Sequence, residues 1–559
     1  MNDATNGVRL IGGEMNRWAD LAAGRPAAGG PVLRDLVRRF AGPGVRVLVA
    51  GPHEPELLGG LLDSGAGVTV MVRSLPDAEE LAGSTGAEVV CGALDRVRGG
   101  RFDLVVALDG VGRLRSPESA PETWARSVER LVELREDGGT LLLGAENPLG
   151  LHRLAGIADA DPTTIRKWRP EGVRPSGLGE LVDVLPGCGL FLAHPLPGRP
   201  AVLCSPASDL PFEAMEAAAR TSAASLQTSA DPAELLHDAL RAGLAMELAA
   251  GWVVVVGPGA ETLPPALLAA DPVGTGRPVV VEVDGGIRTP CGDLDPRVHG
   301  RVARLPERLA GLLPAGRSLQ RVLERACADH DLPGLRRTLR AYADWVLGLP
   351  GQVGVFATPD NVLIGDVLTG EAGFVLADPS RELTAEVAPE EALARVLRHF
   401  AIGLLAADRP LPWPPGMGAH ELTRLLQVTA GRPADHPAER TGLALEAEIL
   451  AAGRGLSRAE AAPLTAAVAR GEVMGVERLP SHRELLALHG AVTEELRMVR
   501  SRARWAERTL AASEKKAARL EKAVAQRDRQ IRHLKGSRSF RAGRLVTSPG
   551  RVLIRLARA

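Results

Sequence analysis

The stretch "RVLVAGPHEPE", residues 46–56, indicates how the chain folds. Its apolar run, Val47 to Ala50, has the length of a buried strand, and Gly51-Pro52 marks a turn before a helical segment. A strand, a glycine turn and a helix in this order form a crevice where backbone N–H groups can approach a ligand. The single glycine leaves open whether such a ligand is still bound.

Short apolar runs and helical segments alternate regularly from this stretch to residue 143. Runs of four to six apolar residues separated by helices are typical of a parallel sheet that is covered on both faces. The pattern therefore predicts a doubly wound, Rossmann-like α/β domain. Its expected strands are residues 45–50, 67–74, 87–92, 102–109 and 138–146, and its expected helices are 54–65, 75–86 and 122–137.

Composition divides the rest of the chain. A passage rich in proline and alanine, residues 205–219, is interpreted as a boundary, and 431–442 as a linker. Apolar strands at 251–259 and 277–286 are assigned to a second, α+β domain. The expected division is an N-terminal extension (1–40), the doubly wound domain (41–215), the α+β domain (216–431), a linker with a helical segment (432–480), a coiled coil (481–535) and a basic tail (536–559).

A heptad repeat characterises residues 485–534. Twelve of its fifteen a and d positions are apolar, which predicts a coiled coil that makes the protein a homo-oligomer. Alanines and one arginine in this series predict a modest assembly, and the mixed residues leave the number of strands open. The series is Leu485, His489, Val492, Leu496, Val499, Ala503, Ala506, Leu510, Ser513, Ala517, Leu520, Val524, Arg527, Ile531 and Leu534.

Charge is distributed unevenly along the chain. Residues 497–559 contain 19 Lys and Arg against 4 Asp and Glu, whereas residues 1–496 contain 48 basic and 64 acidic residues. This split predicts an acidic body and a tail suited to an anionic surface. Within the tail, Val552, Leu553, Ile554 and Leu556 interleave with arginines, which favours peripheral contact with an anionic membrane; a solvated charged coil is the alternative. Nucleic acid is not expected as a partner, because no recognition motif accompanies Phe540, the only aromatic residue of the segment.

Cysteine usage and hydropathy point to the cytoplasm. The five cysteines are far apart and form no C-x-x-C pair, so neither a disulfide framework nor a metal site is expected. The N-terminus lacks the basic and apolar segments of a secretory signal. The most apolar window, residues 242–260, contains Glu247 and is interrupted by Pro258, so a membrane span is not expected.

Residues 40–205 resemble class I S-adenosylmethionine-dependent methyltransferases. Gly51 stands where that family has its glycine motif, and "FDLVVALDGVGRL" (102–114) is similar to its fourth strand. The segment 131–156 is similar to its following helix, glycine turn and fifth strand, and its ending "ENPLGLHRLAG" is similar to methyltransferase-like proteins of bacterial surface-glycan loci. The resemblance implies S-adenosylmethionine as cofactor and O-methylation of a glycan or small-molecule acceptor.

Three features depart from the family pattern. The acidic residue expected two positions before the first glycine is Val49, and His53 and Pro55 replace further glycines. The carboxylate expected after the second strand, for the ribose hydroxyls, is replaced by Val72 followed by Arg73, and a guanidinium only donates hydrogen bonds. Two usual cofactor contacts are therefore absent.

The remaining candidate site residues follow the strands of the expected sheet, where α/β proteins bind ligands. The resemblance and this placement imply Gly51, Pro52, Val72, Arg73, Asp95 and Asp109 for the cofactor. Asp109, Glu146 and His53 are candidate catalytic groups that accept a proton or orient a hydroxyl. Each also has a structural interpretation: a strand-end turn, a strand stop before a proline, and a surface position at the start of a helix.

The passage "DNVLIGDVLTGEAGFVLADPS" (360–380) faintly resembles aminoglycoside phosphotransferase-type kinases. Asn361 and Asp378 match the asparagine and the metal-binding aspartate of that family, whereas Phe356 stands in place of its catalytic aspartate. The only lysine before residue 500 is Lys167, so phosphoryl transfer is not expected.

Two hypotheses of different classes follow. The first is a cytoplasmic methyltransferase acting near the inner membrane face. The alternative is a non-catalytic scaffold whose degenerate enzyme domains organise a surface-polysaccharide assembly. The state of the cofactor crevice distinguishes them.

Overall fold

The structure is a computed structural model of the 559-residue chain. It describes residues 4–543 except for 6, 22–25, 157–171, 209, 211, 224–231, 271–278, 366–372, 407–411, 414–416, 434–435, 454–455, 457–459 and 471–481. The chain divides into two compact units, residues 1–479 (unit 1) and 480–559 (unit 2). Most of the expected basic tail, residues 544–559, and the segment before unit 2 lie outside the described residues.

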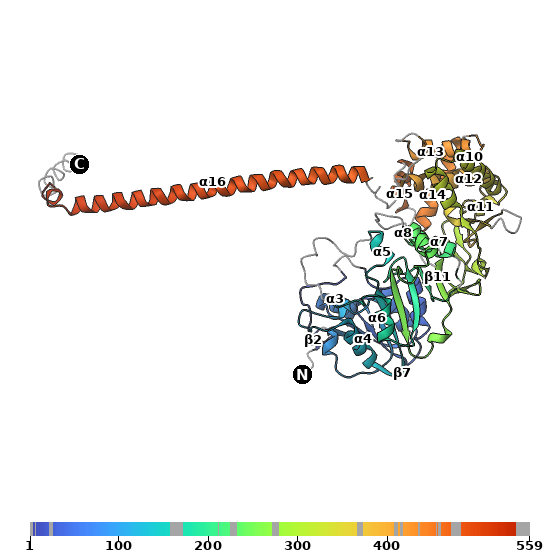
Figure 1. Ribbon diagram of the computed structural model, residues 1–559, viewed down its shortest axis with the longest axis horizontal. Coiled ribbons are helices and arrows are strands. Elements are labelled where there is room, and N and C mark those ends of the chain that lie inside the picture. Colours follow the sequence, from blue (N-terminus) through green and yellow to red (C-terminus); the bar gives the residue numbers. More distant parts are fainter. Residues whose placement is uncertain are drawn as a thin grey trace, which may run out of the picture. The chain divides into compact units, whose positions relative to one another are not determined.

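A sheet of 14 strands dominates unit 1 (Figure 1), in the order β1-β2-β5-β4-β3-β6-β7-β10-β8-β9-β11-β12-β13-β16. The strands from β2 to β7 in this order pair in parallel, which confirms the predicted parallel sheet. Their bounds are β2 Val8–Gly12, β3 Arg46–Ala50, β4 Gly67–Val72, β5 Glu88–Gly92, β6 Phe102–Ala107 and β7 Arg135–Glu146, with β1, Ala4–Thr5, at the edge.

Helices connect these parallel strands because the linking segments carry amphipathic sequences with helix-start signals. Pro55 begins α2 at a position where its missing N–H costs nothing, and the Ser74 hydroxyl caps α3 by accepting from Asp77 N–H. The helices of this region are α1 Pro31–Arg38, α2 Pro55–Asp63, α3 Leu75–Ser84, α4 Trp124–Glu133, α5 Leu151–Leu154, α6 Leu178–Val184, α7 Phe212–Ala223 and α8 Pro232–Arg241.

The sheet does not end at residue 215, so the predicted boundary there is wrong. Strand β10, Gly251–Val256, inserts antiparallel between β7 and β8, with Val253 opposite both Gly144 and Phe191. Strand β12, Val279–Asp284, continues the same sheet through β11. The apolar run of β10 predicts a buried strand but does not specify the strand that pairs with it. The remaining strands are β8 Gly189–His194, β9 Val202–Cys204, β11 Ala266–Ala270, β13 Ile287–Cys291 and β16 Gly311–Leu312.

The second region of unit 1 combines helices with two three-stranded sheets, whereas the strands that the sequence assigned to the α+β domain, residues 251–259 and 277–286, contribute β10 and β12 to the 14-stranded sheet. The sheets are β14-β15-β20 and β17-β18-β19, and a separate apolar core lies among the helices. The strands are β14 Arg297–His299, β15 Val302–Arg304, β17 Arg317–Ser318, β18 Val362–Ile364, β19 Phe374–Leu376 and β20 Arg381–Leu383; the helices are α9 Leu319–Ala328, α10 Leu332–Leu347, α11 Gly351–Gly354, α12 Pro389–Ala406, α13 Ala419–Thr429, α14 His436–Gly453 and α15 Ala461–Arg470.

The predicted linker at 431–442 is only partly correct. Helix α14 begins at His436 within it and joins the second region through buried Leu445 and Ile449. Proline is tolerated in the first turn of a helix, so Pro437 does not interrupt α14.

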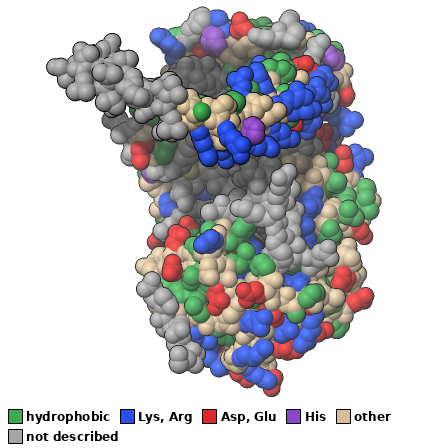
Figure 2. All heavy atoms as spheres, turned by 90° about the vertical axis from the view of Figure 1, so that its left-hand side faces the viewer, with side chains coloured by type: hydrophobic (Ala, Val, Ile, Leu, Met, Phe, Trp, Pro, Cys, Tyr) green, Lys and Arg blue, Asp and Glu red, His purple; other side chains and the backbone are tan. Residues whose placement is uncertain are grey.

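Unit 2 contains α16, His482–Gly536, a helix of 55 residues (Figure 1). Its bounds agree with the predicted heptad segment, and its described side chains are exposed. Lys and Arg side chains are prominent on it (Figure 2). Within the described residues, no helix combines the length and the apolar character that a membrane crossing needs.

Candidate functional site

The order of the parallel strands reverses between β3 and β6, which marks a topological switch point. Ligands of open α/β sheets bind outside the carboxyl ends of the strands at such a point. Gly51 follows β3, Arg73 follows β4 and Asp109 follows β6, so the sequence-predicted residues do converge at this edge.

Gly51 adopts a backbone conformation that favours glycine, with φ at +93°. A Cβ added there would lie 3.6 Å from Asp109 Cβ and 3.6 Å from Leu114 Cδ2. These are ordinary contact distances, so the positive φ and not a lack of space favours glycine here, and the side chains of Asp109 and Leu114 already lie beside it. Pro52, the next residue, is buried and accepts from Ala28 N–H.

His53 is a buried link between β3 and β6, and not the surface residue of its structural interpretation. Leu108 N–H donates to His53 Nε2 at 3.2 Å, so Nδ1 carries the proton and donates to the Gly51 carbonyl at 2.9 Å. Burial lowers the pKa of His53, which keeps the ring neutral. With both ring nitrogens bonded to backbone groups, His53 holds the two strand ends together and has no nitrogen left for a substrate.

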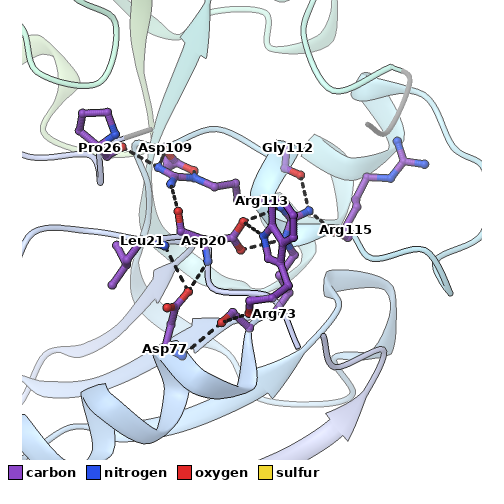
Figure 3. Close-up of polar contacts among 11 residues, drawn as sticks. Asp20, Leu21, Pro26, Arg73, Asp77, Asp109, Gly112, Arg113 and Arg115 are labelled. Carbon is purple, nitrogen blue, oxygen red and sulfur yellow. Dashed lines mark hydrogen bonds and ion pairs between the residues drawn. The ribbon is translucent and has the colours of Figure 1, made fainter. Parts of the chain in front are cut away.

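Arg73 forms a buried ion pair with Asp20, a residue of the N-terminal segment (Figure 3). Its Nε and Nη2 donate to the two Asp20 carboxylate oxygens at 2.8 and 2.6 Å, and Nη1 donates to the Arg115 carbonyl at 2.6 Å. Arg73 thus directs its guanidinium at its own chain from the position after Val72, the residue that stands where the family resemblance expects a carboxylate. Val72, at the end of β4, is buried in the core.

Asp109 forms the second buried ion pair of the crevice. Arg113 Nε and Nη2 donate to its two carboxylate oxygens at 2.8 and 2.6 Å. Arg113 also donates to the Pro26 carbonyl at 2.8 Å and, more weakly, to the Asp20 carbonyl at 3.4 Å (Figure 3). The Arg113 guanidinium donates to both carboxylate oxygens of Asp109, so in this structure the carboxylate is not available as a base.

Residues 13–21 and 26–30 of the N-terminal segment are also held beside the strand ends, by hydrogen bonds of their backbone N–H groups. Met15 N–H donates to the Arg73 carbonyl at 2.8 Å, and Asp20 N–H donates to Asp77 Oδ2 at 2.7 Å. Ala28 N–H donates to the Pro52 carbonyl at 3.1 Å. We call residues 13–21 and 26–30, with the pairs Asp20–Arg73 and Asp109–Arg113, the crevice plug.

The other candidate acids have their own partners. Asp95 lies in a short 3-10 helix and accepts from the Ser119 hydroxyl at 3.0 Å. Glu146 ends β7 and accepts from Arg153 Nε at 3.0 Å and pairs with Arg174 Nε at 2.8 Å. Both carboxylates therefore hold local structure together.

The two residues of the kinase-like passage also meet. Asn361 Oδ1 accepts from Asp378 N–H at 2.8 Å, but the Asp378 carboxylate pairs with Arg304 Nη1 at 2.7 Å. Although burial opposes ionisation, Arg304 and Arg381 lower the pKa of Asp378 to about 2. A buried guanidinium thus binds the carboxylate that would hold a metal in that family. Phe356 is buried beneath Arg381.

His399, which lies beside Asp360 and Glu446, is expected to make the stability of the protein depend on pH. His399 Nδ1 lies 3.1 Å from Glu446 and Nε2 lies 3.6 Å from Asp360. Burial lowers its pKa, but the two carboxylates outweigh burial and raise it to about 9. The stabilisation from the charged ring is complete below the usual pKa of about 6.5 and is lost as the pH rises through about 9.

We expect the melting temperature of the wild type to fall by roughly 2–4 °C more than that of His399→Gln between pH 7 and pH 10, the shift that about 1 kcal/mol produces in a domain of this size. Melting curves at both pH values measure this difference. Equal pH dependence of the two proteins would contradict the assignment of a charged His399.

No known protein family and no curated protein matches the sequence. Solved methyltransferase structures are similar to part of the chain. One, from Archaeoglobus fulgidus, is 14% identical over 40% of this chain and 94% of its own, with a TM-score of 0.25. The 1,6-didemethyltoxoflavin-N1-methyltransferase of Burkholderia thailandensis, solved with S-adenosylhomocysteine, is 21% identical over 20% of this chain, with a TM-score of 0.17. This chain spans half the length of the Burkholderia enzyme.

A third similar structure is the magnesium protoporphyrin IX methyltransferase of Synechocystis with bound S-adenosylhomocysteine. It is 20% identical over 28% of this chain and 72% of its own, with a TM-score of 0.19. At these values the comparisons assign no role to any residue of this protein.

Proposed function

We propose that this protein is a non-catalytic scaffold whose methyltransferase-like domain keeps its cofactor crevice closed with its own residues. One observation carries the proposal: the crevice plug stands at the switch point, where a ligand would bind. The four charged side chains of its two ion pairs are each at most 8% exposed: Asp20, Arg73, Asp109 and Arg113. Burying four charged side chains is tolerated because each carboxylate is matched with a bidentate guanidinium.

The plug is held strongly enough to weaken cofactor binding. Five hydrogen bonds join the segment to the strand ends and to the starts of the helices that follow them; their donors are the backbone N–H groups of Met15, Asp20, Ala28, Glu54 and Leu75. At about 1 kcal/mol each, releasing them costs about 5 kcal/mol. Because affinity falls with the fraction of molecules that are open, this cost weakens binding by roughly three to four orders of magnitude.

Calorimetry of the full chain with S-adenosylmethionine, and with S-adenosylhomocysteine, tests this proposal. We expect no saturable heat up to about 1 mM of either compound, and no rise in melting temperature. A cooperative melting curve in the same buffer confirms that the protein used is folded. Saturable binding in the micromolar range would overturn the scaffold and support the second candidate.

The second candidate is the S-adenosylmethionine-dependent methyltransferase, which the Gly51 turn at the switch point favours. In this function the plug moves aside and the cofactor lies against Gly51. The methyl group passes from the sulfonium to a hydroxyl oxygen of a glycan or similar acceptor, and the hydroxyl proton passes to a carboxylate. Asp109 would accept that proton only after leaving Arg113, and the product would be S-adenosylhomocysteine.

Under either function we place the protein in the cytoplasm near the inner membrane face, where it serves a surface-polysaccharide assembly. The sequence of the basic tail supports contact with anionic lipid. The scaffold function needs no acceptor, whereas the methyltransferase needs one with a free hydroxyl.

A further inference from the structure

Helix α16 exposes a continuous apolar stripe. Eight large apolar side chains at a and d positions are between 46% and 62% exposed: Val492, Leu496, Val499, Leu510, Leu520, Val524, Ile531 and Leu534. We call these eight residues the seam. Among the described residues of α16, only two other large apolar side chains are exposed, Met498 and Trp505. Helical stability in proteins comes mostly from packing of an apolar face, so the seam requires a partner.

The charges beside the seam specify the partner's direction. In a parallel pair of helices in register, each g residue faces the e residue five positions later on the partner. Three such couples carry opposite charges: Glu495 with Arg500, Arg502 with Glu507, and Lys516 with Glu521. Each couple occurs twice in a symmetric pair.

No g and e couple in this parallel arrangement joins like charges. The remaining g and e couples each contain at least one uncharged residue: Leu488 with Thr493, Thr509 with Glu514, Ala523 with Asp528, and Gln530 with Lys535. All charged couples are therefore attractive.

An antiparallel pair with full overlap lacks this complementarity. There e residues face e residues, which joins Arg500 with Glu521 but also Glu507 with Glu514. The attraction of the first couple is cancelled by the repulsion of the second. Charge therefore favours the parallel arrangement.

Two polar d residues, Ser513 and Arg527, limit the affinity. In the parallel pair in register each meets its own copy, and the two Arg527 guanidinium groups repel because both are cations that only donate hydrogen bonds. Sliding by one heptad would separate them, but it would place Glu495 opposite Glu507 and Arg502 opposite Arg500, so the charged couples favour the register without a slip.

We infer that α16 pairs with α16 of a second copy of this chain, in parallel and in register, as a two-stranded coiled coil. This inference is independent of the cofactor crevice and goes beyond the proposed function. The full chain then forms a dimer of about twice 58.7 kDa.

Charge reversal across one couple tests both partner and direction. We expect Glu495→Arg alone, and Arg500→Glu alone, to raise the dimer dissociation constant about tenfold at low salt, because each change makes two repulsive contacts. The double variant restores the wild-type value. The control is Glu494→Arg, an equal charge change one residue outside the couple, at an f position. Sedimentation equilibrium of the full chain measures the dissociation constant of all four variants and of wild type. In 1 M salt the differences between these constants should shrink.

Cross-linking separates the two directions directly. Under mild oxidation, Val492→Cys is expected to give a covalent dimer, because a parallel pair brings residue 492 of both copies together at a d position. In an antiparallel pair these residues lie at opposite ends. The controls are wild type, for the five native cysteines, and Ser501→Cys, which points away from the seam at an f position. A monomer at tens of micromolar, a trimer, or a dimer without the 492 cross-link would each overturn the inference.

Discussion

Replacement of Asp20 by alanine is expected to lower the free energy of unfolding by about 3–5 kcal/mol, because it leaves the Arg73 guanidinium buried without its carboxylate. Arg73 is 6% exposed and receives little compensation from water. Urea titrations of wild type and Asp20→Ala measure the difference from the shift of the midpoint.

The control for this variant is Asp137→Ala. Asp137 also pairs with an arginine, Arg101, but its side chain is 98% exposed, so its loss should change stability by no more than about 1 kcal/mol. Adding Arg73→Met to Asp20→Ala should restore part of the loss, since no unpaired guanidinium remains. If Asp20→Ala were as mild as Asp137→Ala, the plug would not be a closed structure.

Replacement of Gly144 by alanine is the second variant for which we expect a large effect. Gly144 lies in β7, and an added Cβ would overlap the Leu108 carbonyl oxygen and stand 2.7 Å from its carbonyl carbon. Both atoms are backbone and cannot move aside, and Leu108 N–H also holds His53. Overpacking of this kind should cost about 3 kcal/mol, again measured by urea titration.

Gly60→Ala provides the matched control. Gly60 is exposed within α2, and an added Cβ there meets no atom within 4 Å. Alanine favours a helix over glycine by about 1 kcal/mol, so this variant should be slightly more stable than wild type. Opposite effects of Gly144→Ala and Gly60→Ala on the free energy of unfolding would support the close approach of β6 and β7. A Gly144→Ala variant as stable as wild type would contradict it.

The sequence predicted the parallel part of the sheet because each apolar run there has the length of one strand and glycine or proline marks its ends. It did not predict the place of β10, since a run such as "GWVVVV" is buried whichever strands it pairs with. Strand pairing across about 100 residues depends on tertiary packing, which local periodicity does not encode.

The sequence placed Gly51, Arg73 and Asp109 at one edge of the sheet but did not reveal what they contact. Asp20 lies 53 residues before Arg73, and nothing in its neighbourhood indicates a buried carboxylate. Arg113 was detectable in principle, because it follows Asp109 by four residues and such pairs commonly interact. Val72 stands where the acid is expected after β4, and the sequence did not indicate which carboxylate the following Arg73 meets.

Helix α16 has a geometric consequence for the ends of the chain. At 1.5 Å per residue its 55 residues extend about 80 Å. In the inferred parallel pair, both C-terminal segments begin at the same end, and each carries six arginines after Gly536. If each segment binds an anionic surface weakly, as proposed above, two such attachments act together, and the local concentration of the second can strengthen binding by about 10²–10⁴-fold. Dimerisation would thereby act as a threshold: single chains would detach readily, whereas pairs would remain bound.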